Sequence, residues 1–435
     1  MTDLSLKGNV GNPWKSYLGE IYSSRRPPQP LGTVSFDEIE RKAKEKLQDI
    51  PGAFLYAGGS AGTNSTYRAN LRAFERWAII PRMLRDATNR TLETTIFGRK
   101  FHSPILLAPI GVQGIFHADG ELAPARAAHK LKIPYILSTA ATRTIEEVAN
   151  VSGDGERWFQ LYWPRTDEVT LSLLKRAKAA GFHALVVTLD TTLIGWRPHD
   201  LDHSYLPFAH GIGVQVGTSD PVFMGRLGKQ PITETSLEFP YYAAKYDKAF
   251  LEGDSKVKEN VHLGVEWMKE ANSGIYRTWE DLKLLTDNWH GPLVLKGIQS
   301  VQDAEKALEF GVDGLIISNH GGRQVDGAIA SLTALETIMK SSVVREAQTS
   351  GRLTILFDSG IRTGSDIIKA IALGAQAVLL GRPYVYGSIL AGQAGIEQVI
   401  KHTLADLDTN LGLAGYKHLS EIHGKADEVL AKVDQ

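Results

Sequence analysis

A histidine and an arginine stand three residues apart, directly after a short apolar run. The run, Leu315 to Ile317, has no helical spacing and therefore predicts a buried strand. Gly321 and Gly322 follow it and allow a sharp turn that brings the backbone close to a ligand. His320 can accept a proton near neutral pH, and Arg323 can hold a carboxylate with two parallel hydrogen bonds. The pattern indicates a site for a small acid that loses a proton or a hydride; a simple turn with a capping histidine is the alternative.

Seven more apolar runs resemble this one, and each is followed by a polar or small residue. The eight predicted strands cover residues 105–107, 135–137, 158–161, 184–189, 292–295, 315–317, 353–357 and 377–380. Helical patterns alternate with them, so eight strand–helix units predict a closed parallel α/β barrel, the (β/α)8 or TIM barrel. An open doubly wound sheet is the competing architecture, but residues 108–115 lack the glycine-rich fingerprint that it would place there.

The barrel is expected to span residues 104–420, between an N-terminal extension and a C-terminal tail. Within residues 1–103 we expect an irregular arm to residue 35, a helix over 36–47 capped by Ser35, and a second helix ending at Gly58 and Gly59. Short strands are predicted near residues 77–80 and 92–97, and residues 421–435 form the tail. A long insertion after the fourth strand, at about residues 191–277, is interpreted as a lid over the barrel mouth, with a plain surface excursion as the alternative.

The composition excludes several classes of function. The 435 residues carry a formal net charge of −1 without a long basic run, so nucleic acid is not an expected partner. The chain contains no cysteine, which excludes disulfides, thiolate metal sites and a thiol nucleophile, and no metal is expected. No apolar run reaches the length of a membrane span, and the first 30 residues do not resemble a signal peptide. We therefore expect a cytoplasmic protein; the C-terminus lacks a Ser-Lys-Leu address, although a peroxisomal location stays open.

Other strand ends carry residues that are able to contact a ligand at the same face of the barrel. Asp190 ends the fourth strand and is expected to orient His320 and stabilise its protonated form. Lys296 ends the fifth strand, where it would stabilise negative charge. Tyr162 and Arg197 are candidate contacts for a substrate oxygen and carboxylate. Each of these side chains could equally pack or pair locally, and their spacing alone leaves that alternative open.

The ends of the last two strands predict a phosphate site. Gly360 and Arg362 follow the seventh strand, and Gly381 and Arg382 follow the eighth. Barrels commonly bind phosphate with these two loops, through backbone N–H groups and arginines. Asp358 would repel a phosphate but accept hydrogen bonds from the hydroxyls of an attached polyol. A phosphorylated cofactor with a polyol chain is implied, and flavin mononucleotide (FMN) fits.

With these residues laid out, the chain resembles the FMN-dependent α-hydroxy-acid oxidoreductases from about residue 36 to about residue 422. The motifs that carry the resemblance are Ser318 to Gln324, Asp358 to Gly364, and Gly381 to Pro383. Three further stretches, together with the long insertion, resemble the branch of lactate 2-monooxygenase: Gly195 to Pro198, Asp220 to Phe223, and Gly381 to Tyr384. The resemblance implies a small 2-hydroxy acid and dioxygen as reactants, and a homotetramer.

The resemblance also implies a role for each candidate residue. His320 would be the base with Asp190 behind it, while Arg323, Arg197 and Tyr162 would contact the substrate. The residues implied for the flavin ring are Ala108, Ser138, Gln160, Thr188, Ser318 and Lys296. Those implied for the ribityl chain and phosphate are Asp358, Gly360, Arg362, Gly381 and Arg382.

Two positions depart from the family pattern. The place of a substrate-contacting tyrosine falls on Leu55, with Tyr56 next to it, and a position that is aromatic in some members is Ala140. A one-residue step turns a helical side chain by about 100°, so Tyr56 is not an automatic replacement. The segment from Gly58 to Asn70 is one residue longer than usual, which allows a local shift of the alignment. We expect a roomier, more apolar pocket and a preference for larger 2-hydroxy acids.

The leading hypothesis is oxidation of an (S)-2-hydroxy acid to the 2-keto acid, or to its decarboxylated acid, with dioxygen as acceptor. A dehydrogenase that passes electrons to another acceptor is the near alternative. A flavin-binding barrel with isomerase-like chemistry would keep the phosphate loops but would not need His320 with Arg323. A non-catalytic binding protein is the third class, and Leu55 at the tyrosine position motivates it.

Overall fold

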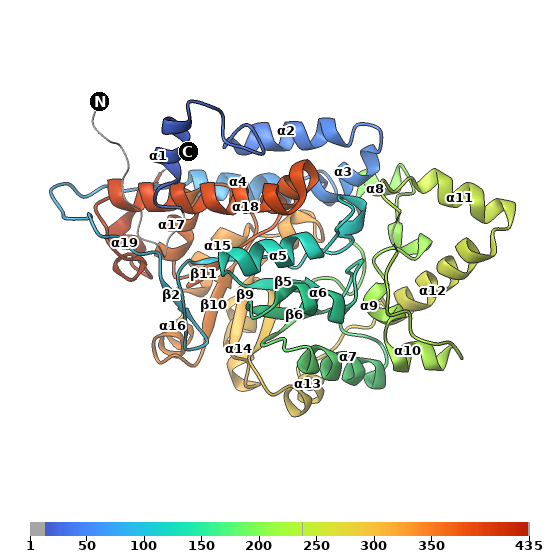
Figure 1. Ribbon diagram of the computed structural model, residues 1–435. Helices are drawn as coiled ribbons and strands as arrows, with labels where there is room; N and C mark the ends of the chain where they lie inside the picture. The colour runs from blue at the N-terminus through green and yellow to red at the C-terminus, as the bar shows by residue number, and fades with distance from the viewer. Residues whose placement is uncertain (1–13, 237, 434–435) are drawn as a thin grey trace.

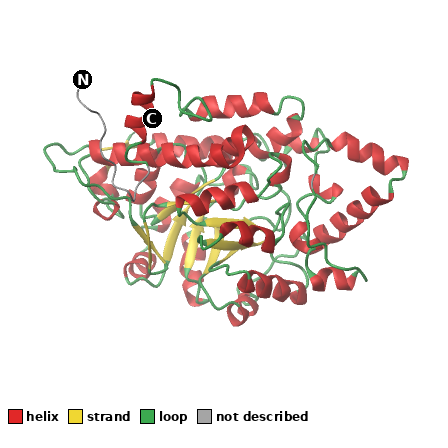
Figure 2. Cartoon of the chain, in the orientation of Figure 1, coloured by secondary structure: helices red, strands yellow, loops and turns green. Residues whose placement is uncertain are grey.

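A closed barrel of eight parallel strands organises the computed structural model, which describes residues 14–236 and 238–433. The barrel strands are β4 (Ile105–Leu107), β5 (Tyr135–Ser138), β6 (Arg157–Leu161), β7 (Leu185–Thr188), β8 (Leu293–Ile298), β9 (Gly314–Ile317), β10 (Thr354–Phe357) and β11 (Ala377–Leu380). They pair in chain order, and β11 closes the ring on β4 through the register Leu379↔Leu106. The predicted (β/α)8 barrel is confirmed, and Figure 2 shows its strands gathered inside a layer of helices.

The barrel strands are buried on both faces, which explains their continuous apolar runs. One residue or more from every strand belongs to a small interior cluster, which includes Leu106, Trp158, Ile316 and Leu356. Their neighbours along the strands, such as Leu107, join the larger core under the surrounding helices. Because side chains alternate along a strand, the two clusters are the inner and outer layers of one barrel wall.

A short hairpin closes the amino-terminal end of the barrel. It consists of β2 (Thr94–Ile96) and β3 (Arg99–Phe101), which pair antiparallel. Phe97 at its tip packs on Trp158 with 5.4 Å between ring centroids, and Trp158 stands at the start of β6. The hairpin fills this end of the barrel and leaves the carboxyl ends of the strands as the face for a ligand.

Helices cover the outside of the barrel. Those after the strands are α5 (Leu122–Leu131), α6 (Ile145–Ser152), α7 (Asp167–Ala179), α13 (Leu282–Asn288), α14 (Val301–Glu309), α15 (Ser331–Ile338), α16 (Ser342–Thr349), α17 (Gly364–Ala372) and α18 (Arg382–Leu413). Several begin at side-chain caps: Thr144 and Thr363 form capping boxes with Glu147 and Asp366. The long α18 packs against α5, α17 and α2 (Phe36–Lys46), as Figure 1 also shows.

The N-terminal extension is more helical than predicted. The expected helices appear as α2, capped by Ser35, and α3 (Pro51–Gly58). The expected irregular arm contains α1 (Tyr17–Ser24), while its first 13 residues lie outside the described part of the chain. No residue of α1 is buried, and the helix is only eight residues long, so its pattern is short. A further helix, α4 (Ser65–Glu75), was not predicted, and it contacts the turn after β9.

The insertion after β7 contains five short or medium helices, which the sequence did not predict. Its helices are α8 (Pro198–Leu201), α9 (Gln215–Thr218), α10 (Pro221–Arg226), α11 (Ala243–Glu252) and α12 (Ser255–Ala271). Glycine and proline lie mainly between these helices, which explains why the composition of the segment did not indicate helices. Asp254 caps α12 by accepting from the N–H groups of Lys256 and Val257. Figure 1 shows the insertion as one group of helices beside the barrel.

The C-terminal tail returns to the N-terminal extension. It contains α19 (Ala426–Val429) and a strand, β12 (Leu430–Lys432), which pairs antiparallel with β1 (Trp77–Ile79). The sequence did not predict β12, because pairing over three residues leaves too short a pattern to detect. Among the described residues, no helix combines the length and apolarity that crossing a membrane requires. The same part of the chain has no group of three His, Cys, Asp or Glu side chains placed for a metal ion.

Candidate active site

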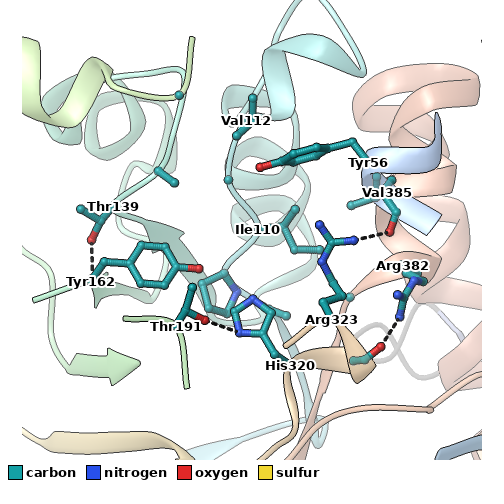
Figure 3. Close-up of a pocket in the computed structure, with 18 of the residues that line it drawn as sticks. Tyr56, Ile110, Val112, Thr139, Tyr162, Thr191, His320, Arg323, Arg382 and Val385 are labelled. Carbon is teal, nitrogen blue, oxygen red and sulfur yellow. Dashed lines mark hydrogen bonds between the residues drawn. The ribbon is translucent and has the colours of Figure 1, made fainter. Parts of the chain in front are cut away.

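A cavity opens at the carboxyl ends of the barrel strands, where most of the predicted site residues meet. Those that line it are Ala108, Tyr162, Arg197, Lys296, His320, Arg323, Asp358, Gly360, Arg362, Gly381 and Arg382. The remaining five, Asp190, Ser138, Gln160, Thr188 and Ser318, lie directly behind this wall and contact one another or its members. Figure 3 shows Tyr162 and His320 on one side of the cavity, with Tyr56 and Arg323 on the other.

His320 is held by residues of the loop that follows β7. Its Nδ1 lies 2.7 Å from Oδ1 of Asp190 and 3.1 Å from the hydroxyl of Thr191, which itself donates to Asp190. The backbone of His320 is left-handed, with φ of 58°, and its N–H donates to the hydroxyl of Ser318. A non-glycine residue in this conformation is strained and is typical of functional sites. Because Nδ1 is occupied, Nε2 is the nitrogen that remains available to a ligand.

The pKa values of this pair suit a proton acceptor. Burial lowers the pKa of His320, although the Asp190 carboxylate partly opposes this shift. Burial would raise the pKa of Asp190, but His320 and the Lys296 ammonium together hold it well below its usual range. The imidazole is therefore neutral at neutral pH and has a fixed anion ready to stabilise its protonated form.

Lys296 is a buried cation between two carboxylates. Its Nζ lies 3.6 Å from Asp358 and 3.8 Å from Asp190, and it donates to the hydroxyl of Ser318 at 3.1 Å. Burial lowers the pKa of Lys296, but the two carboxylates raise it above its usual value overall. The lysine therefore keeps its positive charge at the floor of the cavity.

Behind the cavity, Ser138, Gln160 and Thr188 form a row across three neighbouring strands. Gln160 accepts from the Ser138 hydroxyl at 3.1 Å and donates to the Thr188 hydroxyl at 3.0 Å. The register places Ser138 beside Gln160, and Thr188 beside Lys296. This row presents polar groups to the end of the barrel, where a polar ring could hydrogen-bond.

Three arginines converge on the cavity from different loops. Arg323 and Arg382 both donate to the carbonyl of Gly59, each at 2.9 Å. Arg197, from the start of the insertion, donates to the carbonyl of Arg323 at 3.0 Å. Burial and repulsion by Arg197 and Arg382 lower the pKa of Arg323 to about 9. Three mostly buried cations that meet at one cavity indicate that it is built for anions.

The phosphate-side residues fit a phosphorylated group. Within the described chain, Nε and Nη2 of Arg362 and Nε of Arg382 are buried without a hydrogen-bond partner. Gly360 has φ of 109°, and a Cβ there would lie 2.9 Å from the ring of Phe74, so only glycine suits this turn. Unpaired guanidinium donors beside a glycine turn provide what the phosphate of FMN requires.

The tyrosine of the N-terminal extension is Tyr56, and the assignment of this place to Leu55 is wrong. Tyr56 lines the cavity, its ring lies 5.5 Å from the guanidinium carbon of Arg323, and Leu55 is not among the lining residues. Burial raises the pKa of its hydroxyl against the opposing charges of Arg197 and Arg323. Helix α3 therefore turns Tyr56, and not Leu55, toward the cavity.

Several residues of the site carried no clear signal in the sequence. Asn70 of α4 and Asn319 exchange two side-chain hydrogen bonds of 2.8 and 2.7 Å, across 249 positions of the chain. Asn319 also accepts from the N–H of Gly322, so this pair fixes the turn that carries His320. The insertion contributes apolar walls: Phe208, Trp267, Met268 and Ala271 line the cavity with Ala140 and Val112. Of these residues, only Thr191 could have been predicted, because it directly follows Asp190 at the end of the fourth strand.

The comparisons with known proteins agree with this geometry. The family model of FMN-dependent dehydrogenases matches residues 43–428. An FMN-dependent α-hydroxy acid dehydrogenase of Penicillium citrinum is 44% identical over 410 residues, covering 93% of this chain and 94% of the relative. An L-lactate oxidase of Lysinibacillus sphaericus is 37% identical, covering 96% and 97%.

Solved structures of mandelate oxidase share the fold. One is 35% identical and matches with a TM-score of 0.70, covering 89% of this chain and 96% of the other. Another, bound to 2-hydroxy-phenylacetamide, is 33% identical with a TM-score of 0.70 and covers 92% and 98%. The family model spans most of the chain, and the loops that meet at the cavity lie within it. The chain belongs to the FMN-dependent dehydrogenase family, whose α-hydroxy-acid oxidases and dehydrogenases are its relatives, and FMN is its cofactor.

Proposed function

We propose that this protein oxidises an (S)-2-hydroxy acid to the 2-keto acid and passes the electrons to dioxygen. The observation that carries the proposal is that His320, hydrogen-bonded to Asp190, lines one cavity with Arg323 and Arg197. A neutral base beside two guanidinium groups matches a substrate with an oxidisable carbon next to a carboxylate. The names of the relatives, which include lactate and 4-hydroxymandelate oxidases, support the same chemistry.

In this proposal the chain supplies binding and proton transfer. Arg323 and Arg197 hold the substrate carboxylate, while the Tyr162 and Tyr56 hydroxyls face its other oxygens. Burial raises the pKa of Tyr162 to about 12, so this hydroxyl stays protonated and can donate. His320 accepts one of the two protons that the substrate loses, and Asp190 stabilises the imidazolium that results. FMN, when bound, supplies the acceptor for the two electrons.

The cofactor contacts follow from the same cavity. Lys296 would face the flavin ring and stabilise negative charge on it, above the row of Ser138, Gln160 and Thr188. Ala108 and Ser318 would complete the ring site. The set proposed for the ribityl chain and phosphate is Asp358, Gly360, Arg362, Gly381 and Arg382.

The insertion is proposed to act as a lid, and its walls favour a large substrate. Phe208, Trp267 and Met268 give the cavity an apolar side opposite the barrel, and Ala140 leaves room beside them. A lid of this kind would exclude water during the oxidation. Because Tyr56 occupies the tyrosine place, the preference for larger 2-hydroxy acids now rests on Ala140 and these walls.

Anaerobic reduction tests the function directly. Lactate, 2-hydroxyoctanoate and mandelate, each as the (S)-enantiomer, are added to the holoprotein while the flavin absorbance is followed. We expect bleaching with the larger acids at lower concentrations than with lactate. Lactate as the best substrate would contradict the size preference, and no bleaching with any acid would contradict the activity. Admitting air then separates an oxidase, which forms the keto acid, from a lactate 2-monooxygenase-like enzyme, which forms the decarboxylated acid.

Electron transfer to another acceptor is the second candidate. The relatives from Penicillium citrinum and Schizosaccharomyces pombe, both 44% identical, are named dehydrogenases. Reoxidation of the reduced protein by a quinone, with none by air, would favour this alternative. The tetramer that the resemblance implies stays a prediction, which light scattering of the purified holoprotein tests.

Replacing Asp190 with asparagine should lower kcat about 100-fold at pH 8, because the imidazolium loses its anion. It should also move the pH profile. The base is active when it is neutral, so kcat/KM decreases at pH values below the pKa of His320. Burial places this pKa below the usual value of 6.5. Since Asp190 raises that pKa, Asp190→Asn should shift this limb to lower pH. Stopped-flow reduction between pH 4.5 and 9 measures both effects, and an unmoved limb would contradict the pairing.

A further inference from the structure

The carboxamide of Gln324 joins the two loops that carry the proposed catalytic groups. Its Nε2 donates to the backbone carbonyls of Asp190 at 2.9 Å and Leu193 at 2.8 Å. Its Oε1 accepts from the N–H of Gly195 at 3.2 Å and from Nη2 of Arg197 at 2.7 Å. All four partners lie in the segment from Asp190 to Arg197, at the start of the insertion.

The two loops touch each other closely around this side chain. A Cβ at Gly195 would lie 2.4 Å from the carbonyl oxygen of Arg323 and 2.9 Å from Cα of Gln324. That same Arg323 carbonyl accepts from Nε of Arg197 at 3.0 Å. The segment that holds Asp190 and Arg197 is therefore fastened to the turn that holds His320 and Arg323. Gln324 is the side chain that makes most of the polar contacts between them.

We propose that Gln324 is a positioning residue, which holds the His320–Asp190 pair and the arginine pair (Arg197 and Arg323) in one working geometry. The inference rests on the proposed function, because it concerns the substrate carboxylate and the base of that same site. Gln324 does not line the cavity, so it acts through Arg197 and the backbone of Asp190.

The chemistry of the contacts explains why an amide is needed at this position. The segment presents two acceptors, which are carbonyls, and two donors, which are an N–H and a guanidinium. A carboxamide has both donors and acceptors and satisfies all four groups. A carboxylate has no donor for the carbonyls and would neutralise Arg197, which the substrate needs. A leucine of similar size leaves all four groups without this partner.

The test compares Gln324→Leu and Gln324→Glu with a matched control, Gln398→Leu. Gln398 is also a carboxamide that bridges backbone groups: it accepts from Leu31 N–H at 2.8 Å and donates to the Thr33 carbonyl at 2.9 Å. It belongs to α18 and does not line the cavity. Benzoylformate, a 2-keto acid, serves as the probe. Its dissociation constant is measured on each holoprotein from the change in flavin absorbance, beside thermal unfolding and FMN content.

We expect both Gln324 variants to bind benzoylformate at least about tenfold more weakly. Leucine removes the contact with Arg197 and the loop anchor, while glutamate loses the donor for the two carbonyls and neutralises Arg197. Their rate of anaerobic reduction by (S)-mandelate should fall as well, while FMN stays bound. Gln398→Leu should unfold at lower temperature but bind the probe as the wild type does. If Gln324→Leu is not recovered with FMN, Gln324→Glu carries the comparison.

The outcomes separate this inference from the proposed function. A wild-type protein that neither binds benzoylformate nor is reduced by any 2-hydroxy acid removes the proposed function itself. A wild type that does both, with Gln324 variants that match it in affinity and reduction rate, overturns the positioning role alone. Equal losses in the Gln324 and Gln398 variants would reduce the effect to general stability and would also overturn it.

Discussion

Replacement of His320 with asparagine is expected to lower kcat/KM for 2-hydroxy acids about 1000-fold and to leave FMN bound. A positioned general base contributes about 10²- to 10⁴-fold to a proton transfer, and asparagine cannot accept the proton. Asparagine is chosen because the backbone of His320 is left-handed, with φ of 58°, and asparagine tolerates this region better than most residues. Anaerobic stopped-flow reduction, with the wild type and the variant at equal FMN content, measures the loss.

The control for this variant is His402→Asn. His402 is a half-buried histidine in α18, and it does not line the cavity. The flavin of the His402→Asn variant should be reduced at the wild-type rate, even if the unfolding temperature of the variant falls. If His320→Asn retained more than about a tenth of the wild-type kcat/KM, His320 would not be the base, and the reading of the His320–Asp190 pair would fail.

The barrel was predictable from the sequence because parallel strands leave a strong local signal. Each of its strands is buried on both faces, so runs such as Leu315 to Ile317 appear as unbroken apolar stretches. The carboxyl ends of parallel strands meet at one face, and this rule alone gathered Asp190, Lys296, His320 and Asp358 around one site. The position of a residue at the end of a strand therefore predicted most of the site residues.

The contributions from outside the barrel were harder to predict, because they depend on contacts between distant parts of the chain. Asn70 matters through Asn319, which lies 249 positions away, and nothing near Asn70 announces that contact. The helices of the insertion could not be predicted because helices such as α9 and α10 are short and contain glycine or proline themselves. The place of the tyrosine was assigned to Leu55, one residue before Tyr56. A step of one residue changes which face of α3 a side chain occupies.

The positive charges of the cavity support the proposal that a carboxylate site and a phosphate site are neighbours. Arg323 lies between Arg197 on the substrate side and Arg382 on the phosphate side, and both lower its pKa. Arg323 and Arg382 also share the Gly59 carbonyl as an acceptor. A carboxylate and a phosphate bound on either side would relieve this repulsion. The cluster is therefore costly to fold alone and favourable to bind, which is typical of a functional site.

Arg323→Met should accordingly raise KM for (S)-mandelate about 100-fold, because removing one partner of a buried, hydrogen-bonded charge pair costs about 2–5 kcal/mol. Arg323→Lys should lie between methionine and wild type, since lysine keeps the charge but loses the bidentate geometry. Methyl mandelate, which has no carboxylate, provides the internal comparison: its kcat/KM should be similar in all three proteins. Steady-state kinetics at pH 8 measures each value.

The matched surface control is Arg85→Met, which removes an ion pair with Glu421 of 2.8 Å at a side chain that is 38% exposed. It should leave KM for both substrates unchanged. If Arg323→Met impaired methyl mandelate as strongly as mandelate, the arginine would support the cavity as a whole and would not recognise the carboxylate. If it impaired neither, Arg197 alone would suffice for carboxylate binding, and the pairing of the two guanidinium groups would be wrong.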